Sequence, residues 1–116
     1  MADTQNTDTT IRKLYDTISS RKGGDTEVSY TAKLFDLGTE KIAQKLGEEA
    51  LETVIAAVAG NRDALIDESA DLLYHLLVAW ADAGILPEDV MIELGRREGT
   101  SGLAEKAGRG IAGRGI

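Results

Sequence analysis

Two long runs of helix-forming sequence are joined by only two residues, and this feature limits the possible folds more than any other. Residues 39–59 and 62–83 both repeat apolar side chains at the three- and four-residue spacing of a helix. Gly60 commonly follows a helix end, and Asn61 is a good N-cap for the next helix. So short a connection makes consecutive helices antiparallel neighbours. The sequence therefore predicts a helical hairpin at the centre of the fold.

The rest of the chain predicts shorter helices and no strand. Aromatic residues make up only 4% of the sequence, which disfavours a β-sandwich or barrel. We predict an all-α, four- to five-helix bundle over residues 10–106, between a disordered segment at 1–9 and a flexible, Gly/Arg-rich tail at 107–116. The helices expected outside the hairpin are one that begins after Thr9 or Thr10, one through residues 30–35 that is capped by Ser29 and ends near Gly38, and one from Pro87 to about Arg96.

Charge and composition exclude several classes of protein. The net charge of −7 argues against a general binder of nucleic acid or of anionic membranes, although residues 96–116 hold five basic and two acidic side chains. There is no apolar run of the roughly 20 residues that span a membrane. The first ten residues lack the basic and apolar segments of a signal peptide. With no cysteine in the sequence, we expect a cytoplasmic protein without disulfides.

Five acidic side chains interrupt the apolar surface of the predicted hairpin. Acidic side chains are almost never fully buried unless they are paired. On a helical wheel, Glu49 lies furthest inward, beside an apolar stripe that includes Leu46, Ala50 and Val54, and Glu48 lies furthest outward. Glu49 and Glu52 form one pair at a spacing of three residues. The pair in the second helix is Glu68 and Asp71, and an antiparallel hairpin allows the two pairs to face each other.

Four carboxylates that share one groove require a compensating charge. Unit charges about 4 Å apart repel by roughly 4 kcal/mol even at an effective dielectric constant of about 20. The groove would therefore take up protons or a divalent cation. A set of oxygen ligands suits Mg²⁺, and Mn²⁺ is also possible. Mg²⁺ held by carboxylates indicates phosphoryl transfer or hydrolysis of a phosphoanhydride.

Simpler interpretations remain open for single residues of this set. A solvated helix face explains Glu48, and a salt-bridge network with Lys41 and Lys45 is the main alternative for the others, although two lysines do not neutralise four carboxylates. His75 is either a core histidine or a contact to substrate. Ferritin-like di-iron chemistry requires Glu-x-x-His motifs, and the residue three positions before His75 is Leu72, so that chemistry is excluded.

The acidic residues form a pattern that resembles a known metal-binding motif. Glu-Glu-x-x-Glu at residues 48–52, followed after fifteen residues by Glu-x-x-Asp at 68–71, resembles the motif of the MazG-like all-α nucleoside triphosphate pyrophosphohydrolases. The segments SYTAKLF, KIAQKLGEEALET and ESADLLYHLLV are similar to the phosphoribosyl-ATP pyrophosphohydrolase family of histidine biosynthesis. With a closing R-x-G-x-S-G-x-x-E-K at 97–106, the resemblance covers about residues 28–106.

This resemblance implies Mg²⁺-dependent hydrolysis of phosphoribosyl-ATP to phosphoribosyl-AMP and pyrophosphate. It implies that either Glu52 or Glu48 is the general base and that Lys45 stabilises the charge on the leaving pyrophosphate. The metal ligands that it implies are Glu49, Glu52, Glu68 and Asp71. Further substrate contacts are expected from Lys33, Lys41, His75, Arg97 and Lys106.

The resemblance also implies a homodimer, and two rival functions remain. An apolar patch of Leu51, Ile55 and Val58 would be difficult for a lone small bundle to cover, which agrees with dimerisation. One rival is a house-cleaning dNTP pyrophosphohydrolase of the same fold. The other is a non-enzymatic helical interaction module whose acidic groove binds a basic partner or a cation.

Overall fold

The structure is a computed structural model that describes residues 7–99, with side chains from Thr9 onward. This part of the chain is all-α, with no strand. Its helices are α1 (Thr7–Ser20), α2 (Tyr30–Leu37), α3 (Thr39–Ala59), α4 (Arg62–Ala83) and α5 (Pro87–Glu98). The chain divides after Gly84 into two compact units, so that α1–α4 belong to the first and α5 to the second.

Helix α1 begins earlier than the sequence predicted. Residues 7–9, expected to be disordered, form its first turn. The predicted flexible tail at 107–116 lies outside the described residues.

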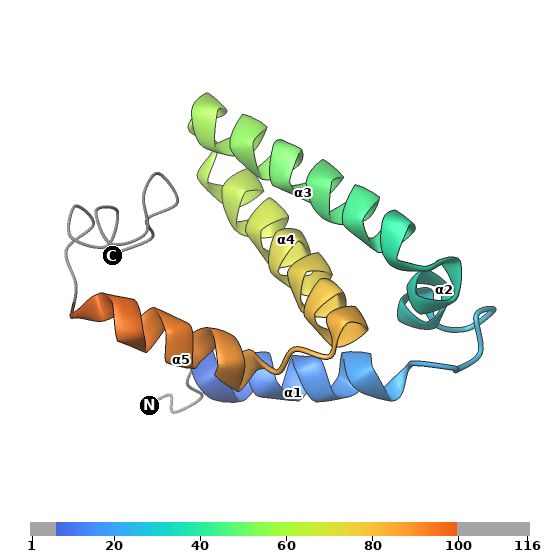
Figure 1. Cartoon of the computed structure of the whole chain (residues 1–116). Helices are drawn as coiled ribbons and strands as arrows, with labels where there is room; N and C mark the ends of the chain where they lie inside the picture. The colour runs from blue at the N-terminus through green and yellow to red at the C-terminus, as the bar shows by residue number, and fades with distance from the viewer. Residues whose placement is uncertain (1–6, 100–116) are drawn as a thin grey trace. The chain divides into compact units, whose positions relative to one another are not determined.

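Helices α3 and α4 form the predicted antiparallel hairpin and lie side by side (Figure 1). Gly60 ends α3 in the left-handed conformation, with φ of 70°, and its N–H donates to the carbonyls of Ala56 and Ala57. The side chain of Asn61 accepts a 3.0 Å hydrogen bond from the backbone N–H of Ala64 and caps α4. Both ends of the connection thus follow the predicted chemistry.

The hydrophobic core lies around the C-terminal half of α4. Lys22, in the loop after α1, donates a 2.5 Å hydrogen bond from Nζ to the carbonyl of Ala81 and joins this loop to the end of α4. All four helices of the first unit contribute side chains to the core. Its buried members are Tyr15 and Ile18 from α1, Leu34 from α2, Ile42 from α3, and Leu77, Val78 and Ala81 from α4.

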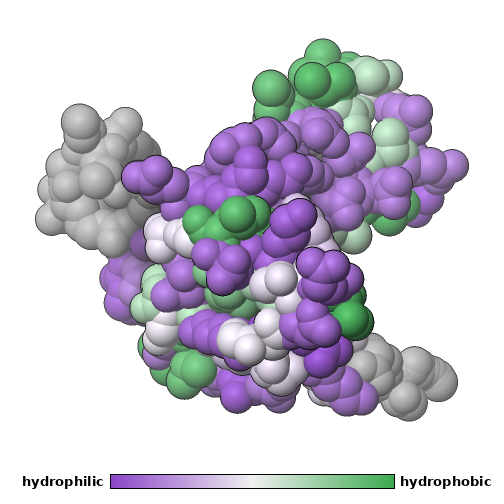
Figure 2. Space-filling model, turned by 90° about the vertical axis from the view of Figure 1, so that its right-hand side faces the viewer, coloured by the Kyte–Doolittle hydropathy of each residue, from purple (hydrophilic) through white to green (hydrophobic). Residues whose placement is uncertain are grey.

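The other half of the hairpin keeps an apolar surface exposed. Only Ile42, Glu49 and Ala56 are buried in α3, spaced seven residues apart. Val54, which the wheel grouped with Leu46 and Ala50 beside Glu49, is 57% exposed. Figure 2 shows hydrophobic residues gathered at the top of the view, over the end of the hairpin. We call the exposed side chains Leu51, Val54, Ile55 and Val58 the α3 apolar face.

Helix α5 has its own stabilising interactions. Pro87 occupies its first turn, and the backbone N–H of Leu86 donates to Asp89 Oδ2 at 2.9 Å. Hydrogen bonds from Arg96, and to a smaller extent from Arg97, lower the pKa of Glu93 to about 2. Among the helices that the structure describes, none has the length and apolar character needed to span a membrane.

Candidate active site

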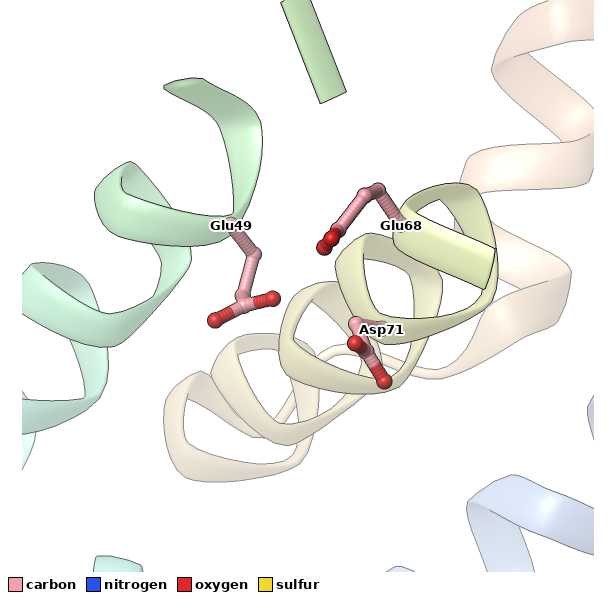
Figure 3. A group of neighbouring side chains, drawn as sticks. All are labelled: Glu49, Glu68 and Asp71. Atoms are coloured by element: carbon pink, nitrogen blue, oxygen red, sulfur yellow. The ribbon is translucent and has the colours of Figure 1, made fainter. Parts of the chain in front are cut away.

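Three carboxylates meet between α3 and α4. One oxygen from each of Glu49, Glu68 and Asp71 lies within 4.8 Å of the others. In Figure 3, Glu49 extends from α3 toward Glu68 of α4, and Asp71 stands one turn further along α4. Glu49 is only 8% exposed, Glu68 is half-buried and Asp71 is exposed. The cluster is therefore deep at Glu49 and open to solvent at Asp71.

Thr53 links the two helices beside this cluster. Its hydroxyl Oγ1 lies 2.8 Å from the carbonyl oxygen of Glu49 and 3.2 Å from that of Glu68, so one hydroxyl connects the backbones that carry both carboxylates. The sequence prediction missed this residue. The available signal was its position, four residues after Glu49, which puts it on the same helix face.

The electrostatics of the cluster favour a bound proton or cation. Burial raises the pKa of Glu68, and the neighbouring carboxylates of Glu52, Asp71 and Glu49 raise it further. Oxygen Oε1 of Glu68 is buried and has no hydrogen-bond partner among the described residues. A divalent cation would compensate the charge of a buried carboxylate oxygen that has no hydrogen-bond donor and lies beside other carboxylates. The all-oxygen donor set fits a hard cation such as Mg²⁺.

Glu52 and Glu48 differ in their surroundings, although both are exposed. Glu52 lies outside the cluster of three but close enough to raise the pKa of Glu68. Glu48 accepts hydrogen bonds from Gln44 at 2.9 Å and from Lys45 at 3.1 Å. These two bonds lower the pKa of Glu48, and the bond from Gln44 has the larger effect. Glu48 is therefore a stabilised carboxylate with partners of its own.

His75 connects the cluster to a group of aromatic side chains. Its Nδ1 lies 2.9 Å from the carbonyl oxygen of Asp71. Because a carbonyl can only accept, Nδ1 carries the proton and donates, and Nε2 of a neutral ring is then an acceptor. Nε2 is buried and has no partner within the described part of the chain. The ring meets Tyr30 and Tyr74 edge-on, with centroids 6.2 and 4.8 Å away. Tyr74 is in turn 2.5 Å from Thr31 Oγ1.

The basic residues predicted to bind substrate belong to different parts of the chain. Lys33, Lys41 and Lys45 line one groove between α2 and α3. Arg97 belongs to α5, where its Nε donates to Glu93 Oε2 at 2.7 Å. Lys106 lies outside the described residues. The expected contacts of Arg97 and Lys106 with substrate therefore stay predictions.

Comparison with known proteins identifies the family of this chain. Residues 11–98 match the family described as phosphoribosyl-ATP pyrophosphohydrolase. The chain belongs to this family. It is 62% identical over 99 residues to the phosphoribosyl-ATP pyrophosphatase of Gluconobacter oxydans (strain 621H), covering 85% of this chain and 74% of that protein. It is 63% identical over 99 residues to the phosphoribosyl-ATP pyrophosphatase of Azospirillum brasilense, covering 85% of this chain and 89% of that protein.

The family match includes the elements of the candidate site that the structure describes. As a member of the phosphoribosyl-ATP pyrophosphohydrolase family, the chain has its carboxylate cluster, Thr53, His75 and the lysine groove all within the matched range of 11–98. Arg97 also falls inside this range, and Lys106 falls outside it. The residues that identify the family and the residues of the acidic cluster thus lie in the same part of the chain.

Proposed function

We propose that this chain hydrolyses the α–β phosphoanhydride of phosphoribosyl-ATP, giving phosphoribosyl-AMP and pyrophosphate, as the second step of histidine biosynthesis in the cytoplasm. Relatives at about 60% identity bear the name of this activity. The observation that carries the proposal is the cluster of Glu49, Glu68 and Asp71 in a member of the family. Such a cluster suits a substrate whose polyphosphate arrives with a divalent cation.

Mg²⁺ is the proposed cofactor, and Mn²⁺ is the expected substitute. Glu49, Glu68 and Asp71 would hold it, with Glu52 near enough to serve as a fourth ligand. When bound, the cation would offset the charge of the phosphate oxygens and lower the pKa of a water molecule. The raised pKa of Glu68 supports this assignment, because burial first and then the neighbouring carboxylates disfavour its charged form when no cation compensates.

Glu52 is the better candidate for the general base. In the reaction, a water oxygen forms a bond to phosphorus, the bond from phosphorus to the bridging oxygen breaks, and the water proton passes to the base. Glu48 is a weaker base because two hydrogen bonds stabilise its ionised form. Glu52 lies beside the metal cluster, where its side chain interacts with that of Glu68.

Lys45 is the proposed partner of the leaving pyrophosphate. Its Nζ already contacts Glu48 at 3.1 Å, and Glu49 also helps to raise its pKa. A lysine beside the carboxylate cluster would stabilise the negative charge that develops as pyrophosphate leaves. Arg97 and Lys106 remain predicted additional contacts, and His75 Nε2 is a predicted acceptor for a donor group of the substrate.

A panel of substrates tests this function. Purified chain is incubated with phosphoribosyl-ATP, ATP and the four dNTPs, with Mg²⁺ or with EDTA, and the products are separated by chromatography. We expect phosphoribosyl-AMP and pyrophosphate from the first substrate only, and only with Mg²⁺. Preferred hydrolysis of a dNTP would support the house-cleaning rival. No hydrolysis at all would favour the non-enzymatic interaction module.

We also propose a homodimer that buries the α3 apolar face. Its four side chains are each between 57% and 84% exposed, which is unusual for neighbouring large apolar residues on a monomer. A second copy that presents the same face would form an isologous contact. No nucleic-acid or membrane partner is part of the proposal.

A further inference from the structure

A groove between α2 and α3 gathers three lysines in an acidic protein. It encloses about 350 Å³, and its lining residues come from α2 and from the first half of α3. Three of its side chains are cationic and one is acidic. The lining residues are Tyr30, Lys33, Leu34, Leu37, Lys41, Gln44, Lys45 and Glu48.

The three lysines are not equivalent. Lys45 forms an ion pair with Glu48, with 3.1 Å between Nζ and Oε1. Lys33 from α2 and Lys41 from α3 have no ion pair or hydrogen bond to any side chain within the described range. The groove holds one carboxylate, Glu48, and it is already hydrogen-bonded to Lys45. In a chain with a net charge of −7, the ammonium groups of Lys33 and Lys41 are therefore available for an anion from outside.

Tyr30 connects this groove with the carboxylate cluster. Its ring lines the groove and also meets the edge of His75, whose Nδ1 donates to the carbonyl of Asp71. The side chain is 51% exposed, so one part of it is accessible to a planar ligand. Lys41 and Glu49 are eight residues apart on α3, which corresponds to about 12 Å along the helix. An elongated ligand could therefore reach both places.

We propose that Lys33 and Lys41 bind a phosphomonoester of the substrate that is remote from the anhydride, namely the 5′-phosphate of the ribosyl group on the purine. This inference rests on the proposed function. Phosphoribosyl-ATP carries phosphate at both ends, separated by a ribose, a purine and a second ribose. The triphosphate lies at the carboxylates, the purine lies over Tyr30, and the remote phosphate lies between the two free lysines. ATP and dNTPs lack this phosphate, so the groove selects against them.

Product binding tests this assignment against the other phosphate source, the leaving pyrophosphate. Affinities for phosphoribosyl-AMP, AMP and pyrophosphate are measured by calorimetry in the presence of Mg²⁺. The proteins are the wild type, Lys33→Gln, Lys41→Gln and the control Lys13→Gln, which removes an exposed lysine of α1. Circular dichroism checks that each variant is folded.

The expected result is selective. The wild type binds phosphoribosyl-AMP more tightly than AMP. Each groove variant loses about tenfold in affinity for phosphoribosyl-AMP, the usual effect of removing one charge-assisted hydrogen bond, and keeps its affinity for AMP and pyrophosphate. The control variant binds all three ligands like the wild type.

Four other results overturn the inference. A loss of pyrophosphate affinity with unchanged phosphoribosyl-AMP affinity assigns the lysines to the leaving group. Equal losses of affinity for AMP and phosphoribosyl-AMP assign the lysines to the nucleotide phosphate. Unchanged affinities for all three ligands show that the lysines bind none of these phosphates. A wild type that hydrolyses phosphoribosyl-ATP but binds both nucleotides equally contradicts this inference alone. A wild type without that hydrolysis contradicts the proposed function itself.

Discussion

At the scale of single residues, the site depends on a glutamate that replaces a core side chain. Glu49 lies midway between Ile42 and Ala56 on the buried line of α3, where an apolar residue would pack against α4. Burying its carboxylate beside Glu68 costs stability unless a cation or a proton compensates. The chain therefore loses packing at the position that we propose as a metal ligand, and a bound cation should restore part of that stability.

Thr53 should affect metal binding without touching the metal. Thr53→Val removes the hydroxyl that connects the carbonyls of Glu49 and Glu68, so the two helices hold the carboxylates less firmly. We expect Mn²⁺ affinity to fall several-fold, corresponding to about 1 kcal/mol for one hydrogen bond. Titration followed by electron paramagnetic resonance measures it. Thr53→Ser keeps the hydroxyl and should bind like the wild type, whereas equal losses in both variants would contradict this role.

The raised pKa of Glu68 predicts a pH dependence in metal-free protein. The folded chain holds a proton on Glu68 at pH values where the unfolded chain has lost it, so stability should decrease as pH rises through the interval just above the ordinary glutamate pKa. In EDTA, we expect a higher melting temperature at about pH 5 than at about pH 7. The lowered pKa values of Glu48 and Glu93 act only at lower pH. Glu68→Gln should reduce this dependence, and an unchanged pH profile in that variant would contradict the assignment.

At the scale of elements, the sequence was most informative where local chemistry decides the structure. The bounds of α3 and α4 were predicted because Gly60 and Asn61 act through local backbone preferences and a side-chain cap. The exposure of Val54 could not be predicted, because a wheel with apolar side chains over more than half its circumference does not say which part meets α4. The link through Thr53 also depends on the relative position of two helices, which no single-helix pattern contains.

Asn61 should therefore matter for the stability of the hairpin. Asn61→Ala removes the side-chain acceptor for the N–H of Ala64 and should lower the free energy of unfolding by about 1 kcal/mol. Urea unfolding followed by circular dichroism measures this change. Asn61→Ser retains an acceptor and should lose much less. If both variants unfold alike, the cap is not what stabilises the start of α4.

At the scale of the whole molecule, the α3 apolar face should hold two copies together. Val58 is 84% exposed, so a change there disturbs few contacts within one chain. Val58→Asp would place a charge in the proposed interface and should weaken dimerisation by about tenfold or more. Light scattering after size-exclusion chromatography measures the mass. The control Lys13→Gln on α1 should remain dimeric, and a wild-type monomer would contradict the proposed interface.

The central claim is that buried carboxylates between α3 and α4 hold the Mg²⁺ needed to release pyrophosphate, and Glu49→Gln tests it most directly. The change keeps the size of the side chain and removes its charge. Pyrophosphate release from phosphoribosyl-ATP is measured with saturating Mg²⁺ for the wild type, Glu49→Gln and the control Glu40→Gln, an exposed glutamate of the same helix. We predict a folded Glu49→Gln protein with activity reduced at least about a hundredfold, and a control with wild-type activity. A folded Glu49→Gln protein that releases pyrophosphate at the wild-type rate would contradict the account.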